Sequence, residues 1–157
     1  MNASPLRLLV IGHDPSPNLR RLCEAVVAGA RDEAIRGVEV RHVRPLDAVA
    51  DDVLASHAVI LVTPENLGYM AGALKDFFDR CFYDLLDRTD ALPYAALIRA
   101  GKDGTGTRRA IESICSGLNW KPVQAPMICR GDWDDRFVAD ARELGMTVAA
   151  GLEAGVF

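Results

Sequence analysis

The sequence lacks the features that mark several other classes of protein. It has no excess of positive charge, because 18 Lys and Arg stand against 22 Asp and Glu and the net charge is −4. Nucleic-acid binding needs a positive surface, so we predict no nucleic-acid partner. Long apolar runs are also missing. The run at residues 8–11 is too short for a signal peptide and no segment could span a bilayer, so we expect no membrane association.

Paired metal or redox ligands are absent as well. The cysteines have no C-x-x-C motif and no His at ligand spacing; they stand far apart, at Cys23, Cys81, Cys115 and Cys129. We therefore predict buried free thiols, no metal site and a cytoplasmic location. The three histidines are scattered, and none stands at catalytic spacing from a Cys or Ser. The histidines therefore predict no catalytic pair with a Cys or Ser.

The sequence does contain apolar runs that alternate with amphipathic helices, which is typical of a parallel sheet. At 157 residues it has the size of one domain, so we predict a single α/β domain over residues 1–157. The strands expected are 6–11, 38–43, 58–62, 94–98 and 123–129. The helices expected run from 19 to near 37, then over 48–54, 74–86, 107–118 and 138–152. This alternation predicts a three-layer, doubly wound, five-stranded parallel sheet.

Local signals refine this pattern. The helix over 74–86 has a wide apolar stripe, and two i,i+4 ion pairs, Asp76–Arg80 and Asp84–Arg88, are expected on its outer face. Pro126 predicts an irregular fifth strand, because proline cannot donate to a sheet ladder. Three aspartates, at 132, 134 and 135, fit the start of the last helix.

The loop after the first expected strand, G-H-D-P-S-P-N at residues 12–18, is a candidate phosphate site. Ser16 is a good N-cap and Pro17 a good first helical residue. The helix start then presents free backbone N–H groups and a positive dipole end to a phosphate. The alternative is that Ser-Pro is only a cap. The candidate binding residues here are His13, Ser16, Pro17, Asn18 and Leu19.

The loop after the third expected strand is the most specific part of the chain. Residues 63–75 read T-P-E-N-L-G-Y-M-A-G-A-L-K. This segment resembles the flavin loop of the flavodoxin-like NAD(P)H-dependent FMN and quinone reductases, in which T-P-x-Y-x-G, a small residue, Gly and Leu-Lys wrap the isoalloxazine ring. The resemblance implies that the ring is bound by Pro64, Glu65, Asn66, Leu67, Gly68, Tyr69 and Met70. The alternative is an ordinary turn with a surface tyrosine.

The loop after the fourth expected strand, A-G-K-D-G-T-G-T at residues 100–107, is rich in glycine. It resembles the family loop that covers the pyrimidine side of the ring, which implies contacts from Ala100, Gly101, Gly104 and Gly106. It is neither a P-loop nor a dinucleotide fingerprint, because its glycine spacing fits neither motif. Basic residues beside it, Lys102, Arg108 and Arg109, either meet the 2′-phosphate of NADPH or form a solvated face.

The same resemblance implies the strand order 2-1-3-4-5 and an activity. FMN would be the cofactor, NAD(P)H would deliver a hydride to flavin N5, and a quinone, free flavin or other small acceptor would then be reduced. Subunits in this family commonly pair, so a homodimer or homotetramer is expected. Two alternatives stay open: a flavodoxin-type electron carrier, and a flavodoxin-like binding module that has lost tight FMN binding.

Overall fold

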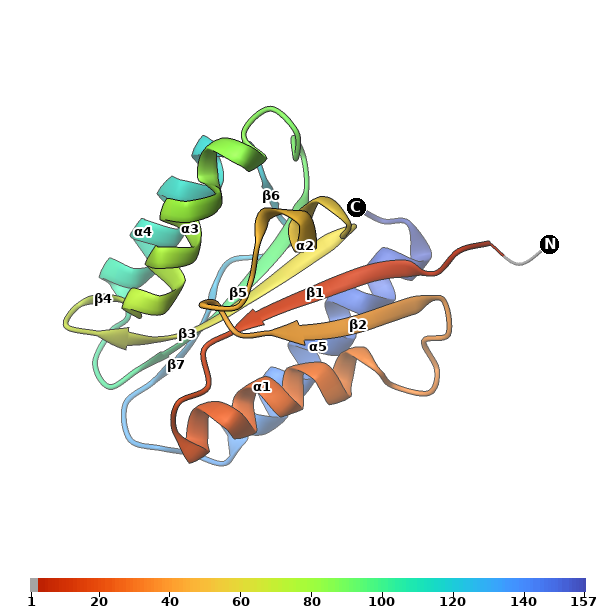
Figure 1. Ribbon diagram of the computed structural model, residues 1–157. Helices are drawn as coiled ribbons and strands as arrows, with labels where there is room; N and C mark the ends of the chain where they lie inside the picture. Colours follow the sequence, from red (N-terminus) through yellow and green to blue (C-terminus); the bar gives the residue numbers. More distant parts are fainter. Residues whose placement is uncertain (1–2) are drawn as a thin grey trace.

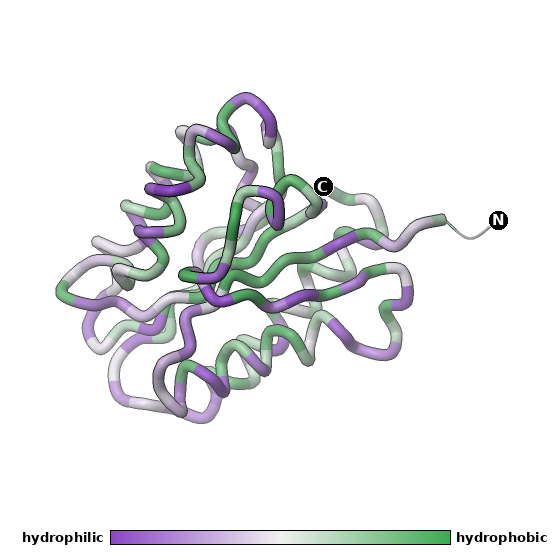
Figure 2. Tube along the Cα trace, in the orientation of Figure 1, coloured by the Kyte–Doolittle hydropathy of each residue, from purple (hydrophilic) through white to green (hydrophobic). Residues whose placement is uncertain are grey.

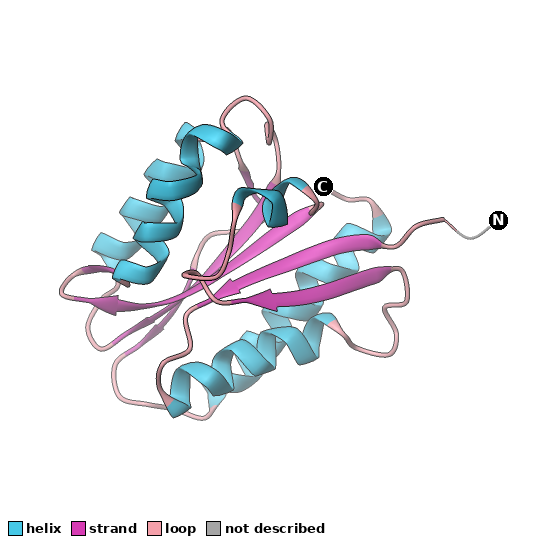
Figure 3. Cartoon of the chain, in the orientation of Figure 1, coloured by secondary structure: helices cyan, strands magenta, loops and turns pink. Residues whose placement is uncertain are grey.

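The structure, a computed structural model, describes residues 3–157 and has three layers around one sheet (Figures 1 and 3). Two helices cover one face of the sheet and three cover the other. The elements in chain order are β1 Leu6–Gly12, α1 Pro17–Ala30, β2 Val38–Val43, α2 Ala50–Leu54, β3 Ala58–Asn66, β4 Tyr69–Met70, α3 Gly72–Leu85, β5 Pro93–Ala100, α4 Thr105–Gly117, β6 Lys121–Pro122, β7 Met127–Arg130 and α5 Arg136–Ala154.

The main strands are parallel and follow the predicted order. β2, β1, β3 and β5 lie side by side, and β5 then pairs with β6 near its start and with β7 near its end. The predicted fifth strand, 123–129, is not continuous: β6 ends at Pro122, before the predicted range, and β7 begins only at Met127. The irregular course predicted from Pro126 is therefore confirmed, and so is the flavodoxin-like order 2-1-3-4-5.

The central strands are buried on both faces, which explains their unbroken apolar sequence. Along β3, Val59 and Leu61 face α3 and α4, whereas Ile60 and Val62 face α1 and α5. Figure 2 shows the resulting concentration of hydrophobic residues along the strands. In the edge strand β2, Val40 and Val43 are buried, whereas Glu39 and Arg41 are exposed.

All four cysteines are free and buried, as predicted. Burial raises the pKa of the Cys23 thiol to about 12, and the charges of Asp14 and Glu24 act in the same direction. Burial likewise raises the pKa of Cys129 to about 11. Thiols with such pKa values stay protonated near neutral pH, so these two side chains are core residues and weak nucleophiles.

Two local predictions were wrong. α1 ends at Ala30 rather than near Gly37, and the Asp32 carboxylate accepts a hydrogen bond from Ala34 N (2.9 Å) in the turn that follows. The Asp76–Arg80 pair is present at 2.7 Å, but the Asp84–Arg88 pair does not form. Because α3 ends at Leu85, Arg88 leaves the helical path and donates to the backbone carbonyl of Asp84 (3.3 Å) instead.

Candidate functional site

The three candidate loops meet at one edge of the sheet, because the strands before them are parallel and end together. Gly12 of β1 aligns with Val62 of β3, which aligns with Leu97 of β5. A hydrogen bond from His13 N to Val62 O (3.0 Å) joins the first loop to β3. In open α/β sheets this carboxyl edge is where ligands bind.

The first loop, residues 13–16, starts α1 as predicted. The Ser16 hydroxyl accepts from Leu19 N (3.3 Å), and Pro17 is the first helical residue. Asn18 is exposed, and its backbone N–H has no acceptor within the helix. Leu19, however, lies in the core, so its side chain cannot contact a ligand. The loop therefore offers a helix N-terminus and the Ser16 and Asn18 side chains.

His13 and Asp14 give this loop its electrostatic character. Burial lowers the pKa of His13, and the neighbouring Asp14 charge opposes that shift without cancelling it. Asp14 itself accepts a hydrogen bond from Arg44 Nε (2.8 Å), which the sequence did not predict. A pocket of about 340 Å³ lies between the first loop and residues 44–47, with Arg20 also on its wall.

The second loop is a β-hairpin, which corrects the prediction that the third strand ends at residue 62. β3 continues to Asn66, and Glu65 and Asn66 pair with Met70 and Tyr69 of β4. The turn between them consists of Leu67 (φ 54°) and Gly68 (φ 77°). Two positive φ angles in a two-residue connection define a type I′ turn, whose twist matches that of the strands. We call residues 65–70 the hairpin.

Thr63 fixes the base of the hairpin. Its side chain is fully buried, accepts from Ala71 N (3.1 Å) and donates to Pro64 O (2.9 Å). Met70 is also buried and packs in the core beside α3. The exposed residues of the hairpin are thus Asn66, the turn residues Leu67 and Gly68, and Tyr69. The threonine that begins the flavin-loop motif holds the loop in place.

The hairpin and the glycine loop, residues 101–104, face each other across a pocket of about 530 Å³. Its lining residues are Glu65, Leu67, Gly68, Gly101, Lys102, Asp103 and Gly106. A Cβ added at Gly68 or at Gly101 would meet nothing within 4 Å, so both glycines expose bare backbone to open space. Such a wall suits a flat ring that must approach main-chain N–H and C=O groups, and these residues fit a flavin.

The other residues predicted in the third loop have structural roles. Ala100 is buried at the end of β5. Gly104 is the N-cap of α4 with φ 70°, and an added Cβ would lie 2.8 Å from the Ile128 side chain. Gly106 lies inside the first turn of α4, where an added Cβ would lie 2.2 Å from Gly68 O. The helix begins at Thr105, earlier than the predicted residue 107.

Charged groups hold the glycine loop in place. Asp103 accepts from Thr105 N (3.0 Å), and this hydrogen bond lowers the pKa of the Asp103 carboxyl. The Arg130 guanidinium donates through Nε to Asp103 O (2.7 Å). Sequence reading missed Arg130, because it stands 27 residues from its partner and only the fold brings the two together.

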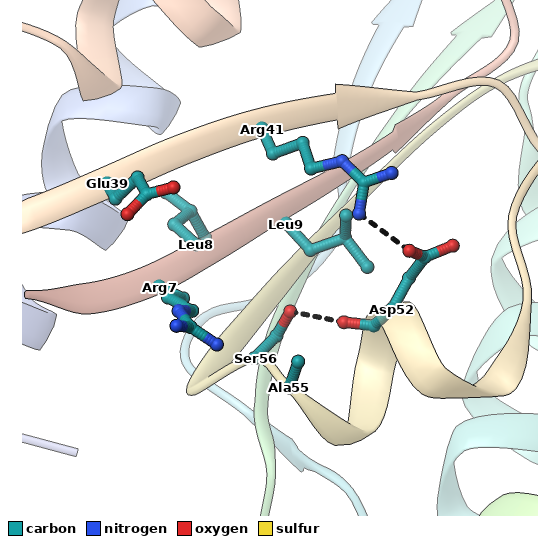
Figure 4. Close-up of a pocket in the computed structure, with 8 residues that line it drawn as sticks. All are labelled: Arg7, Leu8, Leu9, Glu39, Arg41, Asp52, Ala55 and Ser56. Atoms are coloured by element: carbon teal, nitrogen blue, oxygen red, sulfur yellow. Dashed lines mark hydrogen bonds and ion pairs between the residues drawn. The ribbon is translucent and has the colours of Figure 1, made fainter.

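Another pocket, of about 160 Å³, lies away from this edge (Figure 4). It is formed by the first halves of β1 and β2 and by the end of α2. There Asp52 accepts from Arg41 (2.6 Å), and Ser56 donates to the Asp52 carbonyl (2.7 Å). These groups satisfy one another, so the loops at the carboxyl edge remain the candidate site.

Comparisons with known proteins identify the class and then the family. The fold is flavodoxin-like: a flavodoxin from the domain Archaea superposes with a TM-score of 0.79 at 15% identity, over 94% of this chain and 99% of that one. The same fold is found in a WrbA-like flavodoxin from Agrobacterium tumefaciens, with a TM-score of 0.70 at 16% identity over 96% of this chain and 98% of that one. It is also found in an oxidoreductase from Corynebacterium diphtheriae, with a TM-score of 0.69 at 17% identity over 97% of each chain.

The family is defined by sequence. The family model for NADPH-dependent FMN reductases matches residues 21–128, so the chain belongs to that family. A curated relative described as a flavodoxin, from Aquifex aeolicus (strain VF5), is 31% identical over 112 residues. That match covers 71% of this chain and 60% of the relative, so the chain spans less than two thirds of the relative's length. These comparisons confirm the predicted family and, with it, FMN as the cofactor.

Within residues 3–157, no helix is long and apolar enough to cross a membrane, and no three His, Cys, Asp or Glu side chains are grouped as metal ligands.

Proposed function

We propose that this protein binds FMN across the three loops and uses NAD(P)H to reduce a small acceptor such as a quinone or a free flavin. The observation that carries the proposal is the pocket between the hairpin and the glycine loop, with open backbone at Gly68 and Gly101. It lies at the same sheet edge as the helix start beside Ser16, where a phosphate would be bound.

Each loop has its own task in this proposal. The start of α1 would hold the phosphate through backbone N–H groups and Ser16. The hairpin and Gly101 would contact the ring with backbone groups, which can donate to or accept from its polar edge. FMN, when bound, would supply the redox chemistry by accepting a hydride and passing electrons on. No protein side chain needs to act as an acid or base, so the chain's part is to bind, orient and shield.

A direct test combines binding with turnover. Titration of the purified protein with FMN should quench flavin fluorescence, and the loaded protein should oxidise NADPH faster when a quinone is added. Protein-free FMN is the control for turnover. Binding without any stimulated NADPH oxidation would contradict the reductase activity.

The alternative function is electron transfer between proteins. It is favoured by the 31% identity, over 112 residues, to the relative described as a flavodoxin. Carriers dock through strong complementary charge, and a net charge of −4 gives this chain a weak field. Tight FMN binding without reaction with either pyridine nucleotide would select the carrier.

A further inference from the structure

One side-chain contact joins the hairpin to helix α4. Thr107 lies in the first turn of α4, and its side chain is fully buried. Its hydroxyl donates to Glu65 Oε2 (3.3 Å), across 42 residues of sequence. No ion pair within 4.0 Å joins Glu65 to a Lys or Arg in the part of the chain that the structure describes. The Thr107 hydroxyl is therefore the group that fixes this carboxylate.

A backbone contact beside it brings the same two elements even closer. The Gly68 carbonyl of the hairpin turn lies over Gly106, so near that a Cβ there would be 2.2 Å from the oxygen. Helix α4 has no acidic residue in its own first turn. The Glu65 carboxylate, from another element, lies beside that positive end of the helix, where negative charge is favoured.

These contacts determine the width of the pocket. One wall is the hairpin and the other is the glycine loop, which runs directly into α4. The turn itself contains an exposed Leu67 in the left-handed region, so its own conformation does little to hold it. The hydrogen bond between Glu65 and Thr107 holds the hairpin in position, which the turn alone does not do.

We infer that Glu65 is a positioning residue: held by Thr107, its side chain fixes the hairpin on α4 and so sets the spacing of the two walls that contact the flavin ring. This inference rests on the proposed function. It assigns a role to the Glu65 side chain and to Thr107, whereas the proposed function uses only backbone groups of the hairpin.

Two pairs of variants test the contact. Thr107→Val and Glu65→Ala remove it, whereas Thr107→Ser keeps the hydroxyl and Glu65→Gln keeps an acceptor. In the flavin-free protein, amide hydrogen exchange over residues 65–70 should become faster in the first pair and stay unchanged in the second. The dissociation constant for FMN, measured by fluorescence quenching, should rise about tenfold in the first pair, which corresponds to about 1.4 kcal/mol, and return close to the wild-type value in the second.

Glu112→Gln is the matched control, because Glu112 lies on the same helix and pairs with Arg108 (2.6 Å) rather than with the hairpin. It should change neither readout. The inference is overturned if Thr107→Val and Glu65→Ala bind FMN like the wild type, or if the conservative pair loses affinity to the same extent. A wild-type protein that fails to bind FMN would instead refute the proposed function, and the exchange rates would still report whether the contact holds the hairpin.

Discussion

Leu67 is an unusual residue for the place it occupies. It has φ 54° at the first position of a type I′ turn, where Asn and Gly are preferred because a bulkier side chain crowds its own backbone. Its side chain is fully exposed, so packing does not offset the strain. We expect Leu67→Asn to raise the free energy of unfolding by about 0.5–1 kcal/mol, measured by urea denaturation.

Leu46 supplies the control for that change. It is also an exposed leucine, but its φ is not positive. Leu46→Asn should leave the free energy of unfolding unchanged within about 0.5 kcal/mol. An equal gain in both variants would mean that removing an exposed apolar side chain is stabilising, and that the turn at Leu67 is not strained.

His13 makes stability depend on pH. Its pKa in the folded protein is lowered from 6.5 by burial, so the unfolded chain binds the proton more readily. The associated stability is fully present above 6.5, the pKa of His13 in the unfolded chain, and it is lost as the pH falls from there through the lower, folded value. His13→Gln should therefore lose less stability than the wild type between about pH 7.5 and about pH 5.5, as measured by thermal unfolding. Equal losses would contradict the assignment to His13.

Helices α1 and α5 depend on two glycines for their contact. A Cβ at Gly29 would lie 1.9 Å from the Arg142 carbonyl oxygen, and one at Gly145 would lie 2.0 Å from that of Val26. Backbone atoms cannot move aside as a flexible side chain can. Gly29→Ala and Gly145→Ala should each lower the free energy of unfolding by about 1–3 kcal/mol. Gly72→Ala, at the start of α3 with no atom within 4 Å of the new Cβ, should be neutral or slightly stabilising.

The two faces of the pocket should respond differently to added bulk. Gly106→Ala must push the hairpin away, because its Cβ would overlap Gly68 O. It should weaken both FMN binding and the fold. Gly101→Ala should reduce FMN affinity alone, since its Cβ enters open space in the pocket. Calorimetric unfolding of the flavin-free variants separates the two cases. Loss of stability in Gly101→Ala would show that this glycine is structural too.

Elements with a strong local signal were predictable from sequence, and contacts across the fold were not. The start of α1 follows from Ser16 and Pro17, whose capping chemistry is local. The hairpin was missed because the apolar run ends at Val62, whereas the strand continues through the pairing of Pro64 with Arg99 on β5 and of Glu65 and Asn66 with β4. Gly106 was assigned to ligand contact with the other residues of the glycine-rich loop, although the fold requires a glycine there because of Gly68, which is 38 residues away in sequence.

At the scale of the whole molecule, the predicted homodimer or homotetramer and the cytoplasmic location stay predictions.

The binding of FMN can be tested through its effect on the stability of the whole protein. A ligand that binds only the folded state at about 100 times its dissociation constant adds about 2.7 kcal/mol. For a chain of this size each kcal/mol raises the melting temperature by about 2–4 °C. We therefore expect FMN at that concentration to raise it by about 5–10 °C.

Riboflavin distinguishes the two halves of the site, because it has the same ring and no phosphate. The hairpin and the glycine loop would still bind its ring, but the N–H groups at the start of α1 would be left with water. Riboflavin at the same concentration should therefore give a clearly smaller rise in melting temperature than FMN. Equal rises would mean that the loop beside Ser16 binds no phosphate and that Ser16–Pro17 only caps the helix, while the ring-binding pocket would stand.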